Sequence, residues 1–226
     1  MGNLKEDPPR FDAKKKIAKT DLYNDTLSEL NIIIEANPKT ERYYNERGLV
    51  YSKLRNYKEA IKDFTKAIKI NSKSEQAYKN RGNIHSKMKK YKESIKDYSS
   101  AIEINPKLAG VYNNRGLSNE KIGDIEASLF DYTKAIAINP RFASPYNNRG
   151  LIKFDLNDFK GAKNDFDKAI KIDNRFSCAY NNRGMLSNKK KDFKKAIIDL
   201  NNAIELDPRF AQAFTNRGIS YIELGK

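Results

Sequence analysis

The chain has 226 residues, and 44 Lys and Arg against 29 Asp and Glu give it a formal net charge of +15. No stretch approaches the roughly 18 consecutive apolar residues of a membrane span, and the N-terminal segment lacks the apolar run of a secretory signal. With one cysteine and one histidine, neither an intrachain disulfide nor a cysteine-based zinc cluster is expected. The composition predicts a soluble, cytoplasmic chain with no metal, no cofactor and no catalytic centre.

The N-terminal part precedes a clear repeat. Residues 1–10 are expected to form a flexible arm. In residues 11–40, the spacing of Tyr23, Leu30 and Ile33 predicts the second helix of an earlier repeat, but Lys14 stands where the first helix of that repeat would need glycine. We therefore expect residues 11–40 to form a degenerate capping hairpin.

From residue 41 onward the sequence repeats every 34 residues, as the recurring Arg-Gly dipeptide shows. If glycine is placed at repeat position 8, positions 4, 7, 8, 11 and 14 share one helical face, and positions 17, 20, 24 and 27 share another. Each repeat therefore predicts two amphipathic helices joined by a turn at positions 15 and 16. The predicted units are 41–74, 75–108, 109–142, 143–176 and 177–210, with 211–226 as the first helix of a sixth unit or a terminal cap.

The pattern resembles the tetratricopeptide repeat (TPR) family. An aromatic residue at position 4, glycine at 8, a small residue at 20, a mostly aromatic position 24, alanine at 27 and frequent proline at 32 carry the resemblance across residues 41–226. It implies an all-α TPR solenoid, a right-handed superhelix of antiparallel helix hairpins, that acts as a non-catalytic scaffold for protein interactions. Stacking is required because a lone hairpin cannot bury its apolar face.

Arginine at position 7 departs from the family pattern. The row could bind anions, but its helical angle places it on the buried face, where a guanidinium needs a partner. Position 23 supplies an aspartate in every complete repeat. The sequence therefore predicts structural ion pairs Arg47–Asp63, Arg81–Asp97, Arg115–Asp131, Arg149–Asp165 and Arg183–Asp199.

The opposite face of each first helix is expected to line the concave groove. Position 6 carries a row of amides, namely Asn80, Asn114, Asn148, Asn182 and Asn216. The row is similar to the asparagine ladder in the TPR superhelix of O-linked N-acetylglucosamine transferase, and this resemblance implies contact with the backbone of an extended peptide. The alternative is that these amides are solvated or bond to the adjacent helix.

Neighbouring positions extend the predicted peptide site. Position 9 gives an apolar strip interrupted by Asn83, whose alternative role is contact between adjacent first helices. Position 5 adds Asn113, Asn147, Asn181 and Lys79, and position 13 adds Lys53, Lys87, Lys121 and Lys189. These amide, apolar and cationic strips predict an acidic and apolar peptide partner.

The sequence leaves other ligand classes and one self-contact as alternatives. A carboxylate clamp, which in chaperone cofactors grips an acidic C-terminal peptide, is matched by Lys79, Asn83 and Asn114, but Ser144 and Asn148 occupy its last two cationic places. A further alternative is a basic solenoid that binds nucleic acid or an anionic surface non-specifically. Nucleic acid is disfavoured because most aromatic residues fall in core positions and few are left to stack on bases. Self-association through the C-terminal helix stays open.

Overall fold

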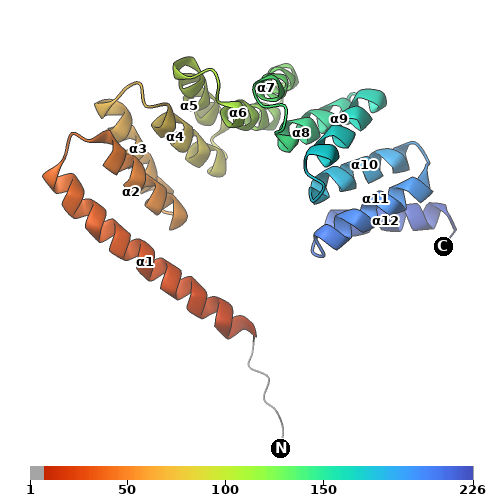
Figure 1. Cartoon of the computed structure of the whole chain (residues 1–226), viewed down its shortest axis with the longest axis horizontal. Coiled ribbons are helices and arrows are strands. Elements are labelled where there is room, and N and C mark those ends of the chain that lie inside the picture. The colour runs from red at the N-terminus through yellow and green to blue at the C-terminus, as the bar shows by residue number, and fades with distance from the viewer. Residues whose placement is uncertain (1–7, 226) are drawn as a thin grey trace, which may run out of the picture. The chain divides into compact units, whose positions relative to one another are not determined.

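The computed structural model describes the backbone of residues 8–225 and the side chains of residues 20–225. All regular elements in this part of the chain are helices, in agreement with the all-α prediction. Across the same residues, no helix is both long and apolar enough to cross a bilayer. The helices are α1 (Pro8–Ala36), α2 (Glu41–Lys53), α3 (Tyr57–Ile70), α4 (Glu75–Lys87), α5 (Tyr91–Ile104), α6 (Ala109–Lys121), α7 (Ile125–Ile138), α8 (Ala143–Asp155), α9 (Phe159–Ile172), α10 (Ser177–Lys189), α11 (Phe193–Leu206) and α12 (Ala211–Glu223) (Figure 1).

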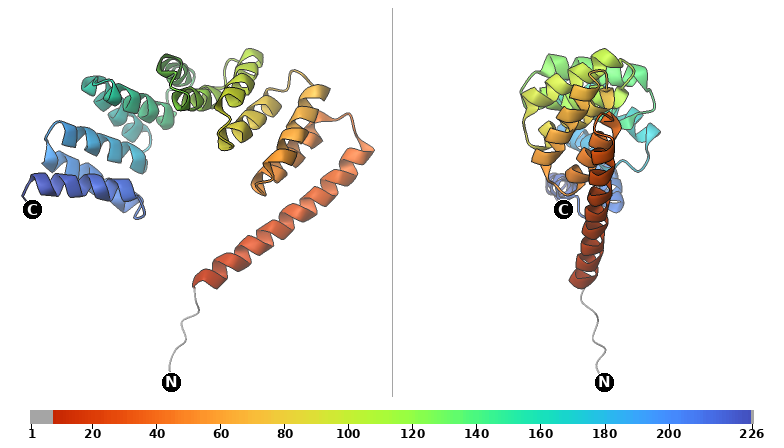
Figure 2. Two further views of the ribbon diagram at one scale, coloured as in Figure 1. Left: turned by 180° about the vertical axis from the view of Figure 1, so that it is seen from behind. Right: turned by 90° about the vertical axis from the view of Figure 1, so that its left-hand side faces the viewer.

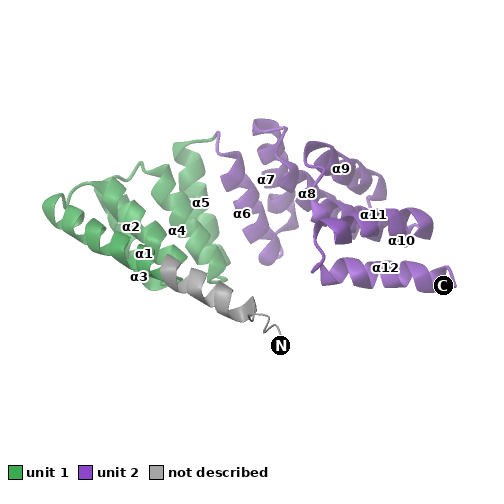
Figure 3. Cartoon of the chain, turned by 60° about the horizontal axis from the view of Figure 1, so that its bottom comes forward, with its two compact units in different colours: residues 1–106 green, residues 107–226 purple. Residues whose placement is uncertain are grey.

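The helices are divided between two compact units, residues 1–106 and 107–226 (Figure 3). In the first unit, α1 packs against α2, and α2–α3 and α4–α5 form hairpins. In the second unit, the hairpins are α6–α7, α8–α9 and α10–α11, and α12 packs against α11. Within each unit the first helices of successive hairpins are neighbours: α2 contacts α4, α6 contacts α8, α8 contacts α10 and α10 contacts α12. Figure 2 shows the hairpins from two further sides.

Each hairpin turn has the same backbone geometry. The residue at position 15 has a left-handed conformation, with φ between 59° and 62° at Arg55, Lys89, Asn157 and Lys191 and 83° at Gly123. The amide at position 16 then donates to the carbonyl at position 11, as Asn56 does to Tyr51 at 2.8 Å. This is the 6→1 bond of a Schellman cap, which satisfies a carbonyl at the helix end.

The interior of each hairpin is built around the glycine at position 8. A Cβ added to Gly48 would lie 2.7 Å from the ring of Phe64, and one added to Gly150 would lie 2.7 Å from the ring of Phe166. Both rings are fully buried. Only a residue without a side chain lets the two helices approach this closely, and this explains the recurring Arg-Gly dipeptide.

The predicted N-terminal hairpin is wrong, because residues 8–36 form one continuous helix, α1. Of the arm predicted for residues 1–10, residues 1–7 lie outside the described part and Pro8 opens the helix, a position at which its missing N–H costs no hydrogen bond. The second half of α1 behaves as a second helix should, since Leu30 and Ile34 are buried against the rest of the first unit. The segment that would form the missing first helix instead extends this second helix.

Candidate functional site

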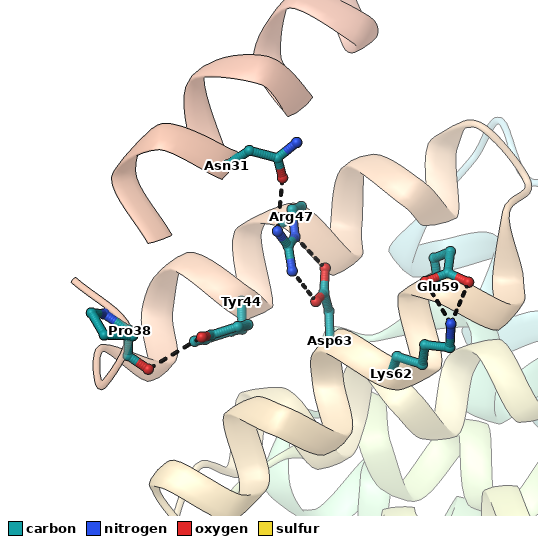
Figure 4. A network of polar contacts seen from close by, with 7 residues as sticks. All are labelled: Asn31, Pro38, Tyr44, Arg47, Glu59, Lys62 and Asp63. Carbon is teal, nitrogen blue, oxygen red and sulfur yellow. Dashed lines mark hydrogen bonds and ion pairs between the residues drawn. The ribbon is translucent and has the colours of Figure 1, made fainter. Parts of the chain in front are cut away.

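The arginines of position 7 and the aspartates of position 23 form bidentate pairs inside the hairpins. Arg47 donates to Asp63 through Nε and Nη2 at 2.8 and 2.7 Å (Figure 4), and Arg149 donates to Asp165 at 2.9 and 2.8 Å. The remaining pairs have the same two-point geometry, with shortest distances of 2.7 Å: Arg81–Asp97, Arg115–Asp131 and Arg183–Asp199. All five carboxylates are buried. These arginines therefore pair with carboxylates inside the hairpins and are not available as an anion-binding surface.

Arginines of this row also reach the preceding repeat, a contact that the sequence analysis missed. Arg47 Nη1 donates to Asn31 of α1 at 2.7 Å, and Arg183 Nη1 donates to Asp167 at 2.7 Å. Position 25 holds the acceptor in these contacts, and the signal was present, since this position carries a hydroxyl, amide or carboxylate in every repeat. The same arginines lie over the aromatic ring at position 4, with separations of 5.3 to 5.8 Å. One side chain thus joins three structural elements.

A second donor at position 11 completes several of these carboxylate sites. Lys153 Nζ lies 2.8 Å from Asp165, Asn119 Nδ2 donates to Asp131 at 3.0 Å, and His85 Nδ1 lies 3.0 Å from Asp97. Burial raises the pKa of Asp97, but the close contacts with His85 and Arg81 outweigh it and leave this pKa below its ordinary value. The single histidine is thus a structural partner of a buried carboxylate.

In the fifth repeat position 11 is Ser187, and a cavity lies beside it. The cavity, of about 560 Å³, lies between α9, α10 and α11, and Ser187 at position 11 is part of its lining. Ser187 is too short to reach Asp199 as Lys153 reaches Asp165. Four cationic and three acidic side chains line the cavity, so it has no strong preference for either sign of charge: Lys163, Arg183, Lys190, Lys195, Asp167, Asp192 and Asp199.

Replacing Ser187 by asparagine is expected to stabilise this repeat. The amide would donate to Asp199 as Asn119 does to Asp131, and a neutral donor adds no charge to a cavity that already holds four cations. One hydrogen bond should raise the free energy of unfolding by about 1 kcal/mol, measured by urea titration. Ser187→Leu fills the same space without a donor. An equal gain in both variants would contradict the hydrogen-bond explanation.

The asparagines of positions 5 and 6 bond to one another. In the second unit, Asn148 Nδ2 donates to Asn113 at 3.1 Å and Asn182 Nδ2 donates to Asn147 at 2.8 Å, each across two adjacent first helices. Position 5 then donates to position 6 of its own repeat, as Asn181 does to Asn182 at 3.1 Å. The donors follow one direction through the unit: Gln212, Asn216, Asn181, Asn182, Asn147, Asn148, Asn113 and Asn114. In the first unit, Asn80 donates to Asn45 at 3.0 Å.

This network changes the role expected of the position 5 amides. Asn113, Asn147 and Asn181 were predicted to face the groove, but their exposed fractions are 5%, 5% and 4%. They lie between adjacent first helices, where a lost partner would leave a buried polar group unsatisfied. We therefore propose no ligand contact for them. The position 6 amides Asn114 and Asn148 are more exposed than Asn80, Asn182 and Asn216.

The open surface of the first helices carries positions 9 and 13. In the second unit, Leu117 and Ile219 are exposed, and Leu151 and Met185 are half-buried between them. Lys121 and Lys189 are exposed beside this apolar strip, whereas the same position holds Asp155 in α8 and Glu223 in α12.

In the first unit, Leu49, Lys53 and Lys87 are exposed and Asn83 is half-buried. Asn83 accepts a hydrogen bond from Tyr98 at 2.8 Å. Lys79 is half-buried, donates to Gln76 at 2.8 Å, and has a pKa that burial lowers below the ordinary value.

Groups that could carry other chemistry are sparse. Among the described residues, no three His, Cys, Asp or Glu side chains are arranged to hold a metal ion. The free Cys178 is exposed on α10.

Comparison with known protein families identifies the same repeat units as the structure. Two family models described as tetratricopeptide repeat match the chain, one at residues 41–74, 75–108 and 177–210 and the other at 109–142 and 143–176. No curated protein matches it. The matched ranges begin at the first residues of α2, α4, α6, α8 and α10.

Three solved structures share the fold. YrrB, a TPR protein with an unusual peptide-binding site, superposes with a TM-score of 0.66 at 20% identity over 84% of this chain and 97% of its own. MamA gives 0.65 at 22% identity over 76% and 97%. The Cut9–Hcn1 hetero-tetramer of the APC/C gives 0.76 at 18% identity over 89% of this chain and 40% of the matched chain. Because the family models cover most of the sequence, the chain belongs to the tetratricopeptide repeat family, whose members are typically non-catalytic and mediate protein–protein interactions.

Proposed function

We propose that this chain is a non-catalytic scaffold that binds an extended, acidic and apolar peptide on the open face of its first helices. The observation that supports this most directly is the surface of the second unit. There the apolar strip of Leu117, Leu151, Met185 and Ile219 runs across four neighbouring helices beside Lys121 and Lys189. We call this surface the unit 2 groove.

The chemistry of the unit 2 groove suits a particular kind of ligand. Apolar side chains favour burial of apolar ligand groups, and exposed ammonium groups attract carboxylates without fixing their geometry. An extended peptide presents side chains on alternate sides, so alternating apolar and acidic residues would match the two strips.

Amides of the position 6 row add a means of holding peptide backbone. Asn148 uses one N–H in its bond to Asn113, and its second N–H has no protein acceptor within residues 20–225. We propose that this donor meets a carbonyl of the bound peptide, as the resemblance to the ladder of O-linked N-acetylglucosamine transferase implies. The similarity to YrrB, a TPR protein with an unusual peptide-binding site, supports the same class of function.

The alternative ligands have less support. For a chaperone-type carboxylate clamp, Ser144 and Asn148 still lack the two cations that the motif requires. For nucleic acid, the buried arginine pairs remove the side chains best suited to bidentate phosphate contact, and Tyr98 and Tyr132 are fully buried. The positive charge that is left is mostly lysine, which favours an acidic protein segment.

Charge reversal in the unit 2 groove is expected to weaken peptide binding. A fluorescent peptide that alternates aspartate and leucine is the probe, and binding is followed by anisotropy. Lys121→Glu with Lys189→Glu should lower affinity on the order of tenfold, because two attractive contacts become repulsive. Asp155→Lys, which removes one of the two carboxylates at position 13 of this unit, the other being Glu223, should raise affinity instead.

The matched control places the same charge change on another surface. Lys160 and Lys168 are exposed on α9, a second helix, and Lys160→Glu with Lys168→Glu gives the same net charge. Equal loss of affinity in both double variants would show that only net charge matters and would refute the groove as the site. Tighter binding of a random single-stranded oligonucleotide than of the peptide would support the nucleic-acid alternative.

A further inference from the structure

The first helix α12 presents a face that in every other repeat is covered by a second helix. A Cβ added to Gly218 would have no neighbour within 4 Å, whereas one added to Gly184, the same position in α10, would lie 2.7 Å from Leu200. Phe214 is 43% exposed and Ile222 is 75% exposed, although the corresponding Tyr146 is buried and Phe154 packs on Phe159 at 5.7 Å. The face is apolar, with room for a helix.

The arginine on this face also lacks a carboxylate partner within residues 20–225. Arg217 donates to Asn201 at 2.7 Å and lies 5.3 Å from the ring of Phe214, as the other arginines of its row do with their neighbours. No carboxylate within residues 20–225 pairs with it, whereas all five arginines at this position in α2 to α10 hold a bidentate aspartate. The face therefore lacks both a covering helix and an anion.

The helix α1 presents an exposed surface that is complementary to this face of α12. It is a second helix by its contacts, since Asn31 accepts from Arg47 as other position 25 residues accept from their arginines. On the side that would meet a first helix, Leu22 is 61% exposed and Ile33 is 36% exposed. Glu29 stands at position 23, where the complete repeats have aspartate, and no cation within residues 20–225 pairs with it.

From these two faces we infer that the chain self-associates head to tail, with α12 of one copy packed against α1 of a second copy. Arg217 then pairs with Glu29, and the apolar side chains around Gly218 cover Leu22 and Ile33. The contact repeats the helix pairing that already exists inside each hairpin, for example between α10 and α11. Such a heterologous contact joins different surfaces, so it leads to open chains or closed rings.

Sedimentation velocity over a concentration series tests the inference on the full chain. It is measured at about 0.15 M salt, because a net charge of +15 opposes association when screening is weak. We expect species larger than the monomer to increase with concentration. Gly218→Gln should weaken association at least tenfold by placing a side chain where the second helix would lie. Its fold should be retained, since nothing occupies that space.

Matched variants make the result specific. Gly110 is another helical glycine with open space around it, so Gly110→Gln should associate as the unmodified chain does. Arg217→Glu and Glu29→Arg should each weaken association, and the two together should restore it. A mixture of Gly218→Gln, which keeps its α1 face, with Glu29→Arg, which keeps its α12 face, should form a heterodimer more readily than either variant associates with itself. A monomer at every concentration, association unaffected by Gly218→Gln, or failure of that mixture would each overturn the inference.

Discussion

Replacement of Arg183 by leucine is expected to lower the free energy of unfolding by about 3 to 5 kcal/mol. The guanidinium donates to Asp199 at 2.9 and 2.7 Å and to Asp167 at 2.7 Å. Without it, Asp199 would stay buried with no partner, because Ser187 does not supply the second donor found in other repeats. Urea titration measures the loss, and amide exchange should locate it in α10 to α12, because repeat proteins open locally.

Two controls separate the lost pair from a general surface effect. Arg42 pairs with Glu46 on an exposed surface, so Arg42→Leu should change stability by less than about 1 kcal/mol. Arg183→Leu combined with Asp199→Leu removes both charges and should cost less than Arg183→Leu alone. A double variant that is as unstable as the sum of the single variants would show that the buried carboxylate is not the source of the effect.

The arginine and aspartate partners could be predicted from the sequence because both lie on helical faces that must be buried. The contacts of Arg47 with Asn31 and of Arg183 with Asp167 could not be predicted so easily, since position 25 varies in residue type and lies in the preceding repeat. The helical angles of residues within one hairpin do not indicate how close their side chains lie to those of the preceding repeat. A search for residues that share only a hydrogen-bond acceptor would have found this row.

The asparagine row shows a different limit. Its spacing correctly places Asn148 and Asn182 on the same side of neighbouring helices. The spacing does not distinguish contact with a ligand from contact with the adjacent helix, because both roles need an asparagine at the same interval. The 3.1 and 2.8 Å bonds to Asn113 and Asn147 exist because adjacent first helices lie close together. That separation depends on packing, which a periodic pattern in one chain does not specify.

The N-terminal prediction failed for a related reason. Helical periodicity predicted that Leu30 and Ile33 lie on the packing face; the structure buries Leu30, but Ile33 is 36% exposed. The mismatch at Lys14 predicted a degenerate first helix followed by a turn, whereas α1 is continuous. A turn needs a residue that takes the left-handed conformation and caps the first helix. In the complete repeats Arg55, Lys89 and Lys191 do this without being glycine, so residue type alone does not mark the turn.

The same substitution at two glycines of the repeat is expected to have opposite effects. Alanine improves helix propensity by about 1 kcal/mol over glycine at either site. At Gly218 the new Cβ meets nothing within 4 Å, so Gly218→Ala should stabilise the monomer by up to about 1 kcal/mol. At Gly150 it would lie 2.7 Å from Cε1 and 2.9 Å from Cδ1 of Phe166, a distance at which something must move.

The packing around Gly150 decides whether Gly150→Ala raises or lowers the free energy of unfolding. Phe166 is fully buried beside Ala162 and Leu186, so its ring cannot move away without displacing other core side chains. Overpacking of this kind costs about 1 to 3 kcal/mol, enough to exceed the gain in helix propensity. Urea titration of the two variants in dilute solution gives the comparison, and since the propensity gain is common to both, the difference between them measures the packing cost. Equal stabilisation by both alanines would contradict the view that glycine at position 8 is required by the ring at position 24. Destabilisation by both would show that the space beside Gly218 is already used.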